Sequence, residues 1–251
     1  NLLLFGEEYA TWEGLIKSVR AKVKGTKVKI RLGASSGEWK AMVADEAART
    51  TFAKNIKTVL EKNKLDGIDL DFEWAENEKE YKDYSLAILK MREVLGDKYL
   101  FSVSLHPVCY KISKEAIEAV DFISLQCYGP SPVRFPIEKY CSDIQMVLEY
   151  GIPREKLVAG VPFYGVTKDN SKKTEAYFNF VQNGLVTSPA QNEVIYQGDT
   201  YVFDGQDNIR IKTRYAKEQK LKGMMSWDLA TDLPLSDSRS LLKTMTEELR
   251  E

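Results

Sequence analysis

Three carboxyl side chains stand at every second position of the segment LDGIDLDFEW, residues 65–74: Asp69, Asp71 and Glu73. The positions between them are apolar. In a strand, alternate side chains point to opposite faces, so the acids would share one face and the apolar residues the other. Carboxylates this close repel one another, and burying them is costly unless they are paired or protonated. The pattern therefore predicts acid–base chemistry, such as a carboxyl group that keeps its proton near neutral pH.

Further candidate side chains come where later apolar runs end. Gln126 and Tyr128 stand at alternate positions after one run, Tyr164 follows the next, and Trp227 follows the last. Catalytic groups of parallel barrels lie at the C-terminal ends of strands, so we expect these side chains to line one cleft with the acids. Carboxyl groups, tyrosine and tryptophan suit a sugar, whose hydroxyls meet polar groups and whose C–H face meets an aromatic ring.

Other kinds of site are weighed against this one. Asp and Glu oxygens bind magnesium or calcium, so a metal site is an alternative for the three acids. A further ligand-rich strand end is missing, and we expect neither a metal nor a cofactor. His106 is the only histidine, which excludes zinc held by several histidines, and we expect it to have a structural or rim role. Cys109, Cys127 and Cys141 lack metal-type spacing and are expected to be free and mostly buried, with one disulfide as the alternative.

The chain alternates apolar runs with amphipathic stretches. The strand-like runs are residues 2–5, 28–32, 67–72, 100–105, 122–127, 157–161 and 223–226. The helix-like stretches are residues 12–23, 44–60, 81–95, 114–119, 137–149, 209–220 and 235–249. Strict alternation predicts an α/β fold with a parallel sheet covered by helices on both faces.

Seven strands with seven following helices are one unit short of a (β/α)8 TIM barrel. We expect the first β/α unit to lie upstream, and an open sheet or a seven-unit barrel is the alternative. Residues 1–251 are expected to form a single barrel domain. Residues 165–208 interrupt the pattern with an aromatic stretch, TEAYFNF, and a candidate hairpin, VIYQGDTYVFDG, so we interpret them as a small insertion after the seventh barrel strand.

The bulk properties limit the partners. The formal charge of −1 and the pI near 6.1, with Lys and Arg spread along the chain, give no reason to expect nucleic acid. No apolar run approaches the roughly 18 residues of a membrane span, and no signal peptide is present. Because the first residue is Asn1, we expect a processed or trimmed chain. We expect the protein to act as a monomer.

Several segments together resemble glycoside hydrolase family 18, the chitinases and endo-β-N-acetylglucosaminidases. LDGIDLDFEW matches the signature DGxDxDxE of that family. VKIRLGASSG is similar to its second motif, FISLQCYG to the strand with the active-site tyrosine, GVPFYG to its seventh strand and GMMSWDLATD to its last strand. The resemblance covers nearly the whole chain and implies that the family's first strand lies upstream of Asn1.

The resemblance implies hydrolysis of a β-1,4 bond next to N-acetylglucosamine. Most retaining glycosidases use one carboxyl group as acid and a second as nucleophile, but this family is an exception, because the sugar's own 2-acetamido oxygen acts as the nucleophile. It implies these roles: Glu73 as general acid and then base, Asp71 as partner of the acetamido N–H, Asp69 as the group that shares a proton with Asp71, Tyr128 as donor to the acetamido oxygen, and Trp227 as floor under the sugar. Gln126 and Tyr164 are expected to line the same subsite. Phe5 and Trp39 are further candidates, for wall or leaving-side contacts.

Two departures from the family pattern concern the substrate. The second motif usually ends Ser-x-Gly-Gly, whereas this chain has Arg31 and Ala34 at the first and last of those positions. Gly129 stands where many chitinases have Asp or Asn. An endo-β-N-acetylglucosaminidase acting on the chitobiose core of N-glycans and a carbohydrate-binding protein without catalysis are the alternatives. A glycan substrate implies a secreted, periplasmic or cell-surface location.

Overall fold

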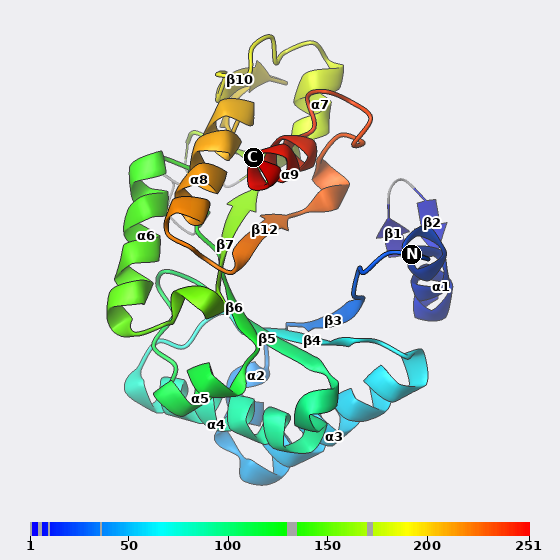
Figure 1. The fold of residues 1–251 in the computed structure, drawn as a ribbon, viewed down its shortest axis with the longest axis vertical. Coiled ribbons are helices and arrows are strands. Elements are labelled where there is room, and N and C mark those ends of the chain that lie inside the picture. The colour runs from blue at the N-terminus through cyan, green and yellow to red at the C-terminus, as the bar shows by residue number, and fades with distance from the viewer. Residues whose placement is uncertain (1, 5–6, 10, 36, 130–134, 170–172) are drawn as a thin grey trace. The chain divides into compact units, whose positions relative to one another are not determined.

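The computed structural model describes residues 1–251 except 1, 5–6, 10, 36, 130–134 and 170–172. The chain divides into two compact units, Asn1–Ile123 and Ser124–Glu251. Six strands form one sheet in the order β12-β7-β6-β5-β4-β3, and each crossover between them carries at least one helix, as in a partial TIM barrel (Figure 1). The predicted single domain and upstream first unit stay predictions.

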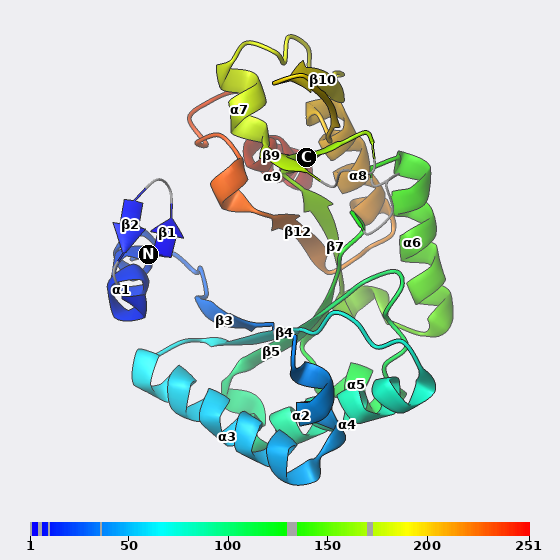
Figure 2. The same ribbon diagram turned by 180° about the vertical axis from the view of Figure 1, so that it is seen from behind.

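Unit 1 contains the strands β3 (Arg31–Ala34), β4 (Gly67–Asp71) and β5 (Leu100–Leu105), which are parallel. The α-helices of unit 1 that connect or follow these strands lie against one side of them in both ribbon views (Figures 1 and 2). They are α2 (Trp39–Ala44), α3 (Glu46–Asn63), α4 (Glu78–Leu95) and α5 (Lys114–Ala119). α1 (Trp12–Lys22) precedes them in the chain, and none of its residues is buried.

Two local features fix β4 between its neighbours. Asp66 precedes the strand: its backbone N–H donates to Ile30 O, and its carboxylate accepts from the Ile30 N–H, both at 2.8 Å. At Gly67 a Cβ atom would lie 1.9 Å from the carbonyl oxygen of Leu100, so only glycine lets β4 and β5 approach this closely. The register that follows places Asp69 opposite Ser102.

Unit 2 contains β7 (Leu157–Pro162) and β12 (Gly223–Trp227), which pair in parallel, and most of β6 (Phe122–Leu125), in which the unit boundary falls. Every residue of β7 is buried. The helix α8 (Gln206–Glu218) contacts α6 (Ile137–Tyr150) and α9 (Leu241–Arg250), as both ribbon views show (Figure 2).

A second sheet lies within the predicted insertion. It orders the strands as β10-β11-β8-β9, with the helix α7 (Tyr177–Gln182) after β9. The strands are β8 (Tyr164–Thr167), β9 (Thr174–Ala176), β10 (Glu193–Tyr196) and β11 (Asp199–Val202). β10 and β11 form an antiparallel hairpin whose turn residues, Gln197 and Gly198, both have positive φ, as two-residue hairpin turns require. The predicted hairpin is thus confirmed.

The prediction that residues 2–5 form the first strand of the parallel sheet is wrong. β1 (Leu2–Leu4) instead pairs antiparallel with β2 (Glu7–Tyr9) in a separate two-stranded sheet. Pairing β1 with β2 closes a loop of a few residues, whereas pairing β1 with β3 would close a longer one. The shorter loop loses less conformational entropy on closing.

The last helix also differs from its prediction, since it begins at Leu241 rather than at residue 235. Ser240 caps it, with its hydroxyl accepting from the Lys243 N–H at 3.1 Å, and Asp232 accepts from the Ser240 hydroxyl at 2.8 Å. These bonds define a helix start that apolar spacing alone does not reveal.

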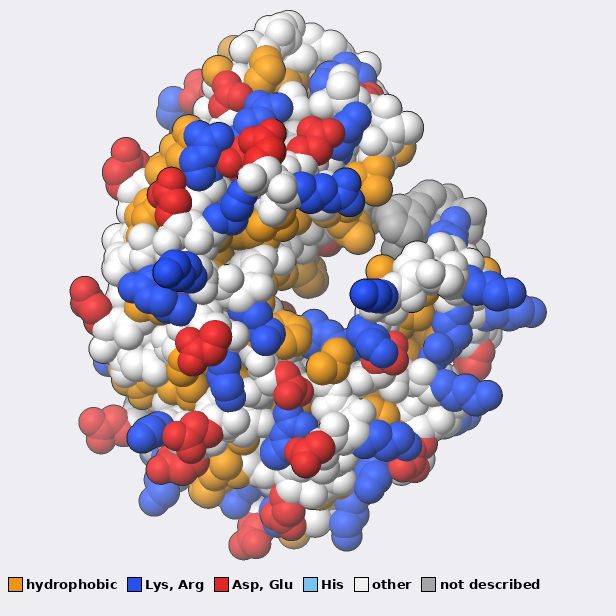
Figure 3. Space-filling model, viewed as in Figure 1, with side chains coloured by type: hydrophobic (Ala, Val, Ile, Leu, Met, Phe, Trp, Pro, Cys, Tyr) orange, Lys and Arg blue, Asp and Glu red, His pale blue; other side chains and the backbone are white. Residues whose placement is uncertain are grey.

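Charge and helix length can both be followed over the described residues. Acidic and basic side chains are interspersed over the described part of the face in Figure 3. No helix among the described residues is long and apolar enough to cross a membrane.

Candidate active site

The three predicted acids follow the alternation expected of a strand. Asp69 and Asp71 are half-buried in β4, and Glu73, two residues beyond the strand end, is exposed. The residues on the opposite face, Ile68, Leu70 and Phe72, are 2 % exposed or less. Unit 1 therefore presents two strand carboxylates and a terminal glutamate from one face, which is the arrangement that the sequence predicted.

Asp69 is held by hydroxyl groups from the neighbouring strand. Ser102 donates to its Oδ1 atom, and Ser104 donates to its Oδ2 atom at 2.7 Å. Arg31, on β3, donates in turn to the Ser102 oxygen. Burial raises the pKa of Asp69, and the two serine hydrogen bonds and the Arg31 charge oppose that effect. Asp69 is thus the acid that the protein itself surrounds with donors.

One tyrosine, Tyr84, and one arginine, Arg31, also lie near these acids. Burial raises the pKa of Tyr84 well above its ordinary value, with the charges of Asp69 and Asp71 acting in the same direction. Its hydroxyl donates to the carbonyl of Leu70 at 3.4 Å. The guanidinium carbon of Arg31 lies 4.6 Å from the centre of the Phe122 ring, a cation–π distance. Tyr84 therefore stays a neutral donor next to the acids.

The loop that carries Glu73 is fixed from α2. The indole N–H of Trp39 donates to the backbone oxygen of Glu73 at 3.3 Å, and the Trp39 ring stacks on Phe72 with centroids 5.3 Å apart. Lys40 forms ion pairs with Glu76 at 3.0 Å and with Glu80 at 3.1 Å. These contacts hold the backbone on both sides of the loop.

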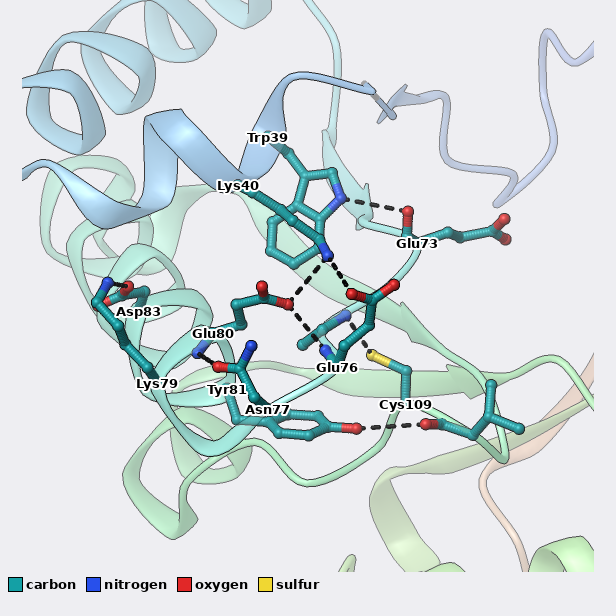
Figure 4. Close-up of polar contacts among 12 residues, drawn as sticks. Trp39, Lys40, Glu73, Glu76, Asn77, Lys79, Glu80, Tyr81, Asp83 and Cys109 are labelled. Carbon is teal, nitrogen blue, oxygen red and sulfur yellow. Dashed lines mark hydrogen bonds and ion pairs between the residues drawn. The ribbon is translucent and has the colours of Figure 1, made fainter.

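The same loop is held from the segment after β5. The Ala75 N–H donates to the thiol sulfur of Cys109 at 3.3 Å, and burial raises the pKa of that thiol. In Figure 4 the carboxylate of Glu73 points away from Lys40 and its acidic partners. None of the described residues hydrogen-bonds or ion-pairs with that carboxylate. Glu73 is thus held at its backbone, while its acid group is exposed.

His106 lies in the interior beneath this loop. It is 2 % exposed, its ring lies 5.1 Å from the ring of Trp74, and its backbone pairs with Cys109 as an isolated bridge. The position agrees with the structural role expected of the only histidine. The peptide bond between Glu73 and Trp74 is cis.

Unit 2 holds the predicted aromatic residues. Tyr128 is 6 % exposed and belongs to an apolar cluster with Phe135 and Val166. The rings of Tyr128 and Tyr164 meet edge to face, with centroids 6.4 Å apart. The Tyr128 hydroxyl lies 3.9 Å from the sulfur of Met225. Tyr128 thus has a ring fixed by packing, and its hydroxyl faces the thioether sulfur of Met225, which is a poor hydrogen-bond acceptor.

Gly160, in β7, is the residue that makes room for this tyrosine. A Cβ atom there would lie 3.0 Å from the Tyr128 ring, 2.8 Å from the Met225 methyl group and 2.6 Å from the carbonyl oxygen of Leu125. Sequence reasoning missed this glycine, because one glycine in the apolar run LVAGVP carries no periodic signal.

A pocket of about 320 Å³ opens beside Trp227 in unit 2. Trp227, 54 % exposed, and Tyr164 form its aromatic walls. The polar residues of its lining are Thr174, Glu175, Asp228 and Thr231. The pocket thus combines an exposed indole with hydroxyl and carboxyl groups, and the substrate-binding role of Trp227 and Tyr164 stays a prediction. Gln126 lies just after β6 and is 8 % exposed.

The predicted residues fall into two sets. Asp69, Asp71 and Glu73 come together in unit 1, and Gln126, Tyr128, Tyr164 and Trp227 belong to unit 2. Trp39, predicted as a wall contact, is 1 % exposed and supports the Glu73 loop instead. Phe5 lies outside the described residues. Arg31, Ser102, Ser104, Cys109 and Gly160 are the supporting residues that the sequence did not identify.

The described residues also bear on metal and cysteine chemistry. No group of three or more His, Cys, Asp or Glu side chains among them is arranged to hold a metal ion. All three cysteines are free; Cys109 and Cys127 are buried, and Cys141 is partly exposed.

The comparisons with known proteins agree with the predicted family. The family model "Glycosyl hydrolases family 18" matches residues 7–232. The Drosophila melanogaster protein named "Probable chitinase 2" is 23% identical over 273 residues, an alignment that covers 82% of this chain and 56% of that protein. The chain thus spans little more than half the length of that relative.

Two solved structures share the fold. A chitinase from Bacteroides thetaiotaomicron has a TM-score of 0.84 at 21% identity, covering 96% of this chain and 82% of its own. The chitinase-like agglutinin RobpsCRA from Robinia pseudoacacia has a TM-score of 0.78 at 19% identity, covering 95% and 85%. At these identities the likeness is one of fold, which hosts both a chitinase and an agglutinin.

Proposed function

Because the chain belongs to glycosyl hydrolases family 18, we propose that it hydrolyses β-1,4 linkages next to N-acetylglucosamine in chitin or chito-oligosaccharides. The proposed reaction retains the anomeric configuration through the substrate's own acetamido group. The acetamido oxygen attacks C1 while the glycosidic bond breaks and the leaving oxygen takes a proton. Water then opens the oxazolinium ion from the opposite side.

The observation that carries the proposal is the set of three acids on β4 and just beyond its end, whose exposure rises toward Glu73. Glu73 is exposed and has no partner for its carboxylate among the described residues, whereas Asp69 is half-buried between two serine donors. A reaction of this kind needs a mobile proton at the cleft and fixed negative charge behind it. Two acids on β4 and the glutamate just beyond its end would supply both.

The remaining roles follow from this assignment. Glu73 gives its proton to the leaving oxygen and takes it back from water. Asp71 accepts the acetamido N–H and stabilises the positive charge, and Asp69 shares a proton with it, because like charges this close do not all ionise. Tyr128 donates to the acetamido oxygen. Trp227 forms the floor, with Tyr164 and Gln126 lining the same subsite.

A carbohydrate-binding protein is the second candidate, since the fold is shared with an agglutinin. The presence of Glu73, Asp71 and Asp69 favours catalysis over binding alone. An endo-β-N-acetylglucosaminidase would use the same residues and differ in the glycan that it admits.

Product analysis on defined substrates tests the proposal. The protein is incubated with chitotetraose and, in parallel, with a high-mannose glycoprotein, each with and without a chelator. We expect short chito-oligosaccharides with β-configuration at the new reducing end, and no effect of the chelator. Release of the high-mannose glycan alone would favour the endoglycosidase, and binding without products would favour the agglutinin-like protein.

Two further parts of the proposal concern the location of the protein and its oligomeric state. The substrate places the protein outside the cytosol, in a secreted, periplasmic or cell-surface location. The protein is proposed to work as a monomer, which size-exclusion chromatography with light scattering would check.

A further inference from the structure

Arg31 is a cation at a position where the family motif usually has serine. It lies on β3, next to β4, and is half-buried. Its guanidinium group lies over the ring of Phe122 and donates to the hydroxyl oxygen of Ser102. A charge in such surroundings acts on its neighbours more strongly than one in bulk water.

The hydrogen bonds fix the direction of the serine proton. A guanidinium group has donors only, so the Ser102 oxygen must accept from Arg31. The hydrogen of Ser102 is then left for Oδ1 of Asp69, and Ser104 donates to Oδ2. Both oxygens of Asp69 thus meet donors, which favours the carboxylate over the protonated acid.

We propose that Arg31 is a positioning residue for the Asp69–Asp71 pair: it directs the Ser102 proton to Asp69 and holds Asp69 as the anionic member, so that the shared proton resides on Asp71. The inference rests on the proposed function, since it concerns the same acids. It assigns a role to the residue in which this chain departs from the family motif.

The other charged and titratable groups around the pair set the sign of the effect. Burial raises the pKa of Asp69, and Arg31 opposes that effect. Tyr84, from α4, stays neutral because burial raises its pKa. Burial lowers the pKa of the Arg31 guanidinium group, and the charges of Asp69 and of Asp121, which precedes β6, oppose that effect. Arg31 therefore supplies the positive charge that acts against burial at Asp69.

The consequence is a wider acidic range of activity. At low pH both members of the pair are protonated, and the pair then lacks the negative charge that the positive intermediate needs. A nearby cation lowers the pH at which the pair gains its second proton. Removing Arg31 should therefore move the acidic limb of the kcat/KM profile to higher pH.

The test uses Arg31→Ser, which installs the family's usual residue, and Arg31→Lys, which keeps the charge. One pH unit below the wild-type midpoint, Arg31→Ser should lose a further roughly three- to tenfold of kcat/KM relative to wild type, and Arg31→Lys less. Arg92→Ser is the matched control, because Arg92 also lies over a phenylalanine ring, Phe101, but bonds Asp121 and not the serines. Its acidic limb should not move.

A second readout does not depend on turnover. The carboxyl ¹³C resonance of Asp69, assigned with Asp69→Asn, is followed through a pH titration in wild type and Arg31→Ser. Its midpoint should rise in Arg31→Ser. Ser102→Ala removes the hydroxyl that links Arg31 to Asp69, with a smaller structural change, and should shift the midpoint in the same direction. It replaces Arg31→Ser in the test if that variant does not fold.

The outcomes separate this inference from the proposed function. The role of Arg31 would be overturned if, in Arg31→Ser or in Ser102→Ala, the midpoint of the activity profile and the midpoint of the Asp69 resonance both stayed where they are in wild type. This holds even where hydrolysis itself is normal. An equal shift in Arg92→Ser would overturn it too, since the effect would then be structural. A wild-type protein without hydrolysis would contradict the proposed function, while the resonance would still decide on Arg31.

Discussion

Gly160→Ala is predicted to disturb Tyr128 through one added methyl group. The new Cβ would lie 3.0 Å from the Tyr128 ring, whereas carbon atoms in ordinary contact are about 3.5–4.0 Å apart. The ring must therefore move by roughly 0.5–1 Å, because the Leu125 carbonyl on the other side is backbone and lies only 2.6 Å away.

Two magnitudes follow from this displacement. Overpacking a filled interior costs about 1–3 kcal/mol of unfolding free energy, which lowers Tm by about 2–4 °C per kcal/mol for a chain of this size. A catalytic group displaced by about 1 Å costs on the order of 100-fold in rate. We expect kcat/KM on chitotetraose to fall by about 10- to 100-fold while the fold persists.

The assay combines thermal unfolding with hydrolysis well below Tm. Gly223→Ala, in β12, is the matched control, because no atom lies within 4 Å of its added Cβ. Tyr128→Phe supplies the second control: in that background Gly160→Ala should lose less of the remaining activity than it does in wild type. A Gly160→Ala protein that is destabilised but keeps kcat/KM within about threefold of wild type would refute the role given to the Tyr128 position.

Two further predictions concern stability and thiol chemistry. Lys212 and Asp204 form a buried ion pair at 2.5 Å, so Lys212→Met, which leaves Asp204 without its cation, should lower the unfolding free energy by about 3–5 kcal/mol in urea titrations. Adding Asp204→Leu to Lys212→Met should restore most of the lost unfolding free energy. A Lys212→Met protein as stable as wild type would contradict this prediction. Burial raises the pKa of the Cys109 and Cys127 thiols, so alkylation of the native protein at pH 8 should modify the more exposed Cys141 first, as peptide mass spectrometry would show. Equal labelling of all three would contradict the burial.

The sequence predicted the features that depend on local period and local turns. Alternation over residues 68–73 predicted the strand and the shared face of its acids, and the structure has both. The hairpin follows from the Gln197–Gly198 turn, which needs only adjacent residues. Helix periodicity located the long helices but missed α2, which has six residues and no side-chain cap.

The supporting network depends on register between strands, which a single sequence does not specify. Asp69 lies opposite Ser102 and Asp71 lies opposite Ser104 only after β4 and β5 are aligned. The alternation of serines in FSVSL was a usable signal, because Ser102 and Ser104 repeat the spacing of Asp69 and Asp71. Arg31 stood out only as a departure from the family motif, and nothing in the sequence indicated that it would bond Ser102.

The central claim is that Glu73 moves the proton, and Glu73→Gln tests it most directly. The glutamine amide keeps the size of the side chain, and the hydrogen bond from Trp39 to the backbone oxygen is unaffected. The amide has no acidic proton that it could transfer to the leaving oxygen. We predict that hydrolysis of chitotetraose falls by about 100- to 10,000-fold, the range for loss of a general acid–base group, while its Kd by calorimetry stays within about threefold. Near-normal turnover by Glu73→Gln would contradict the account.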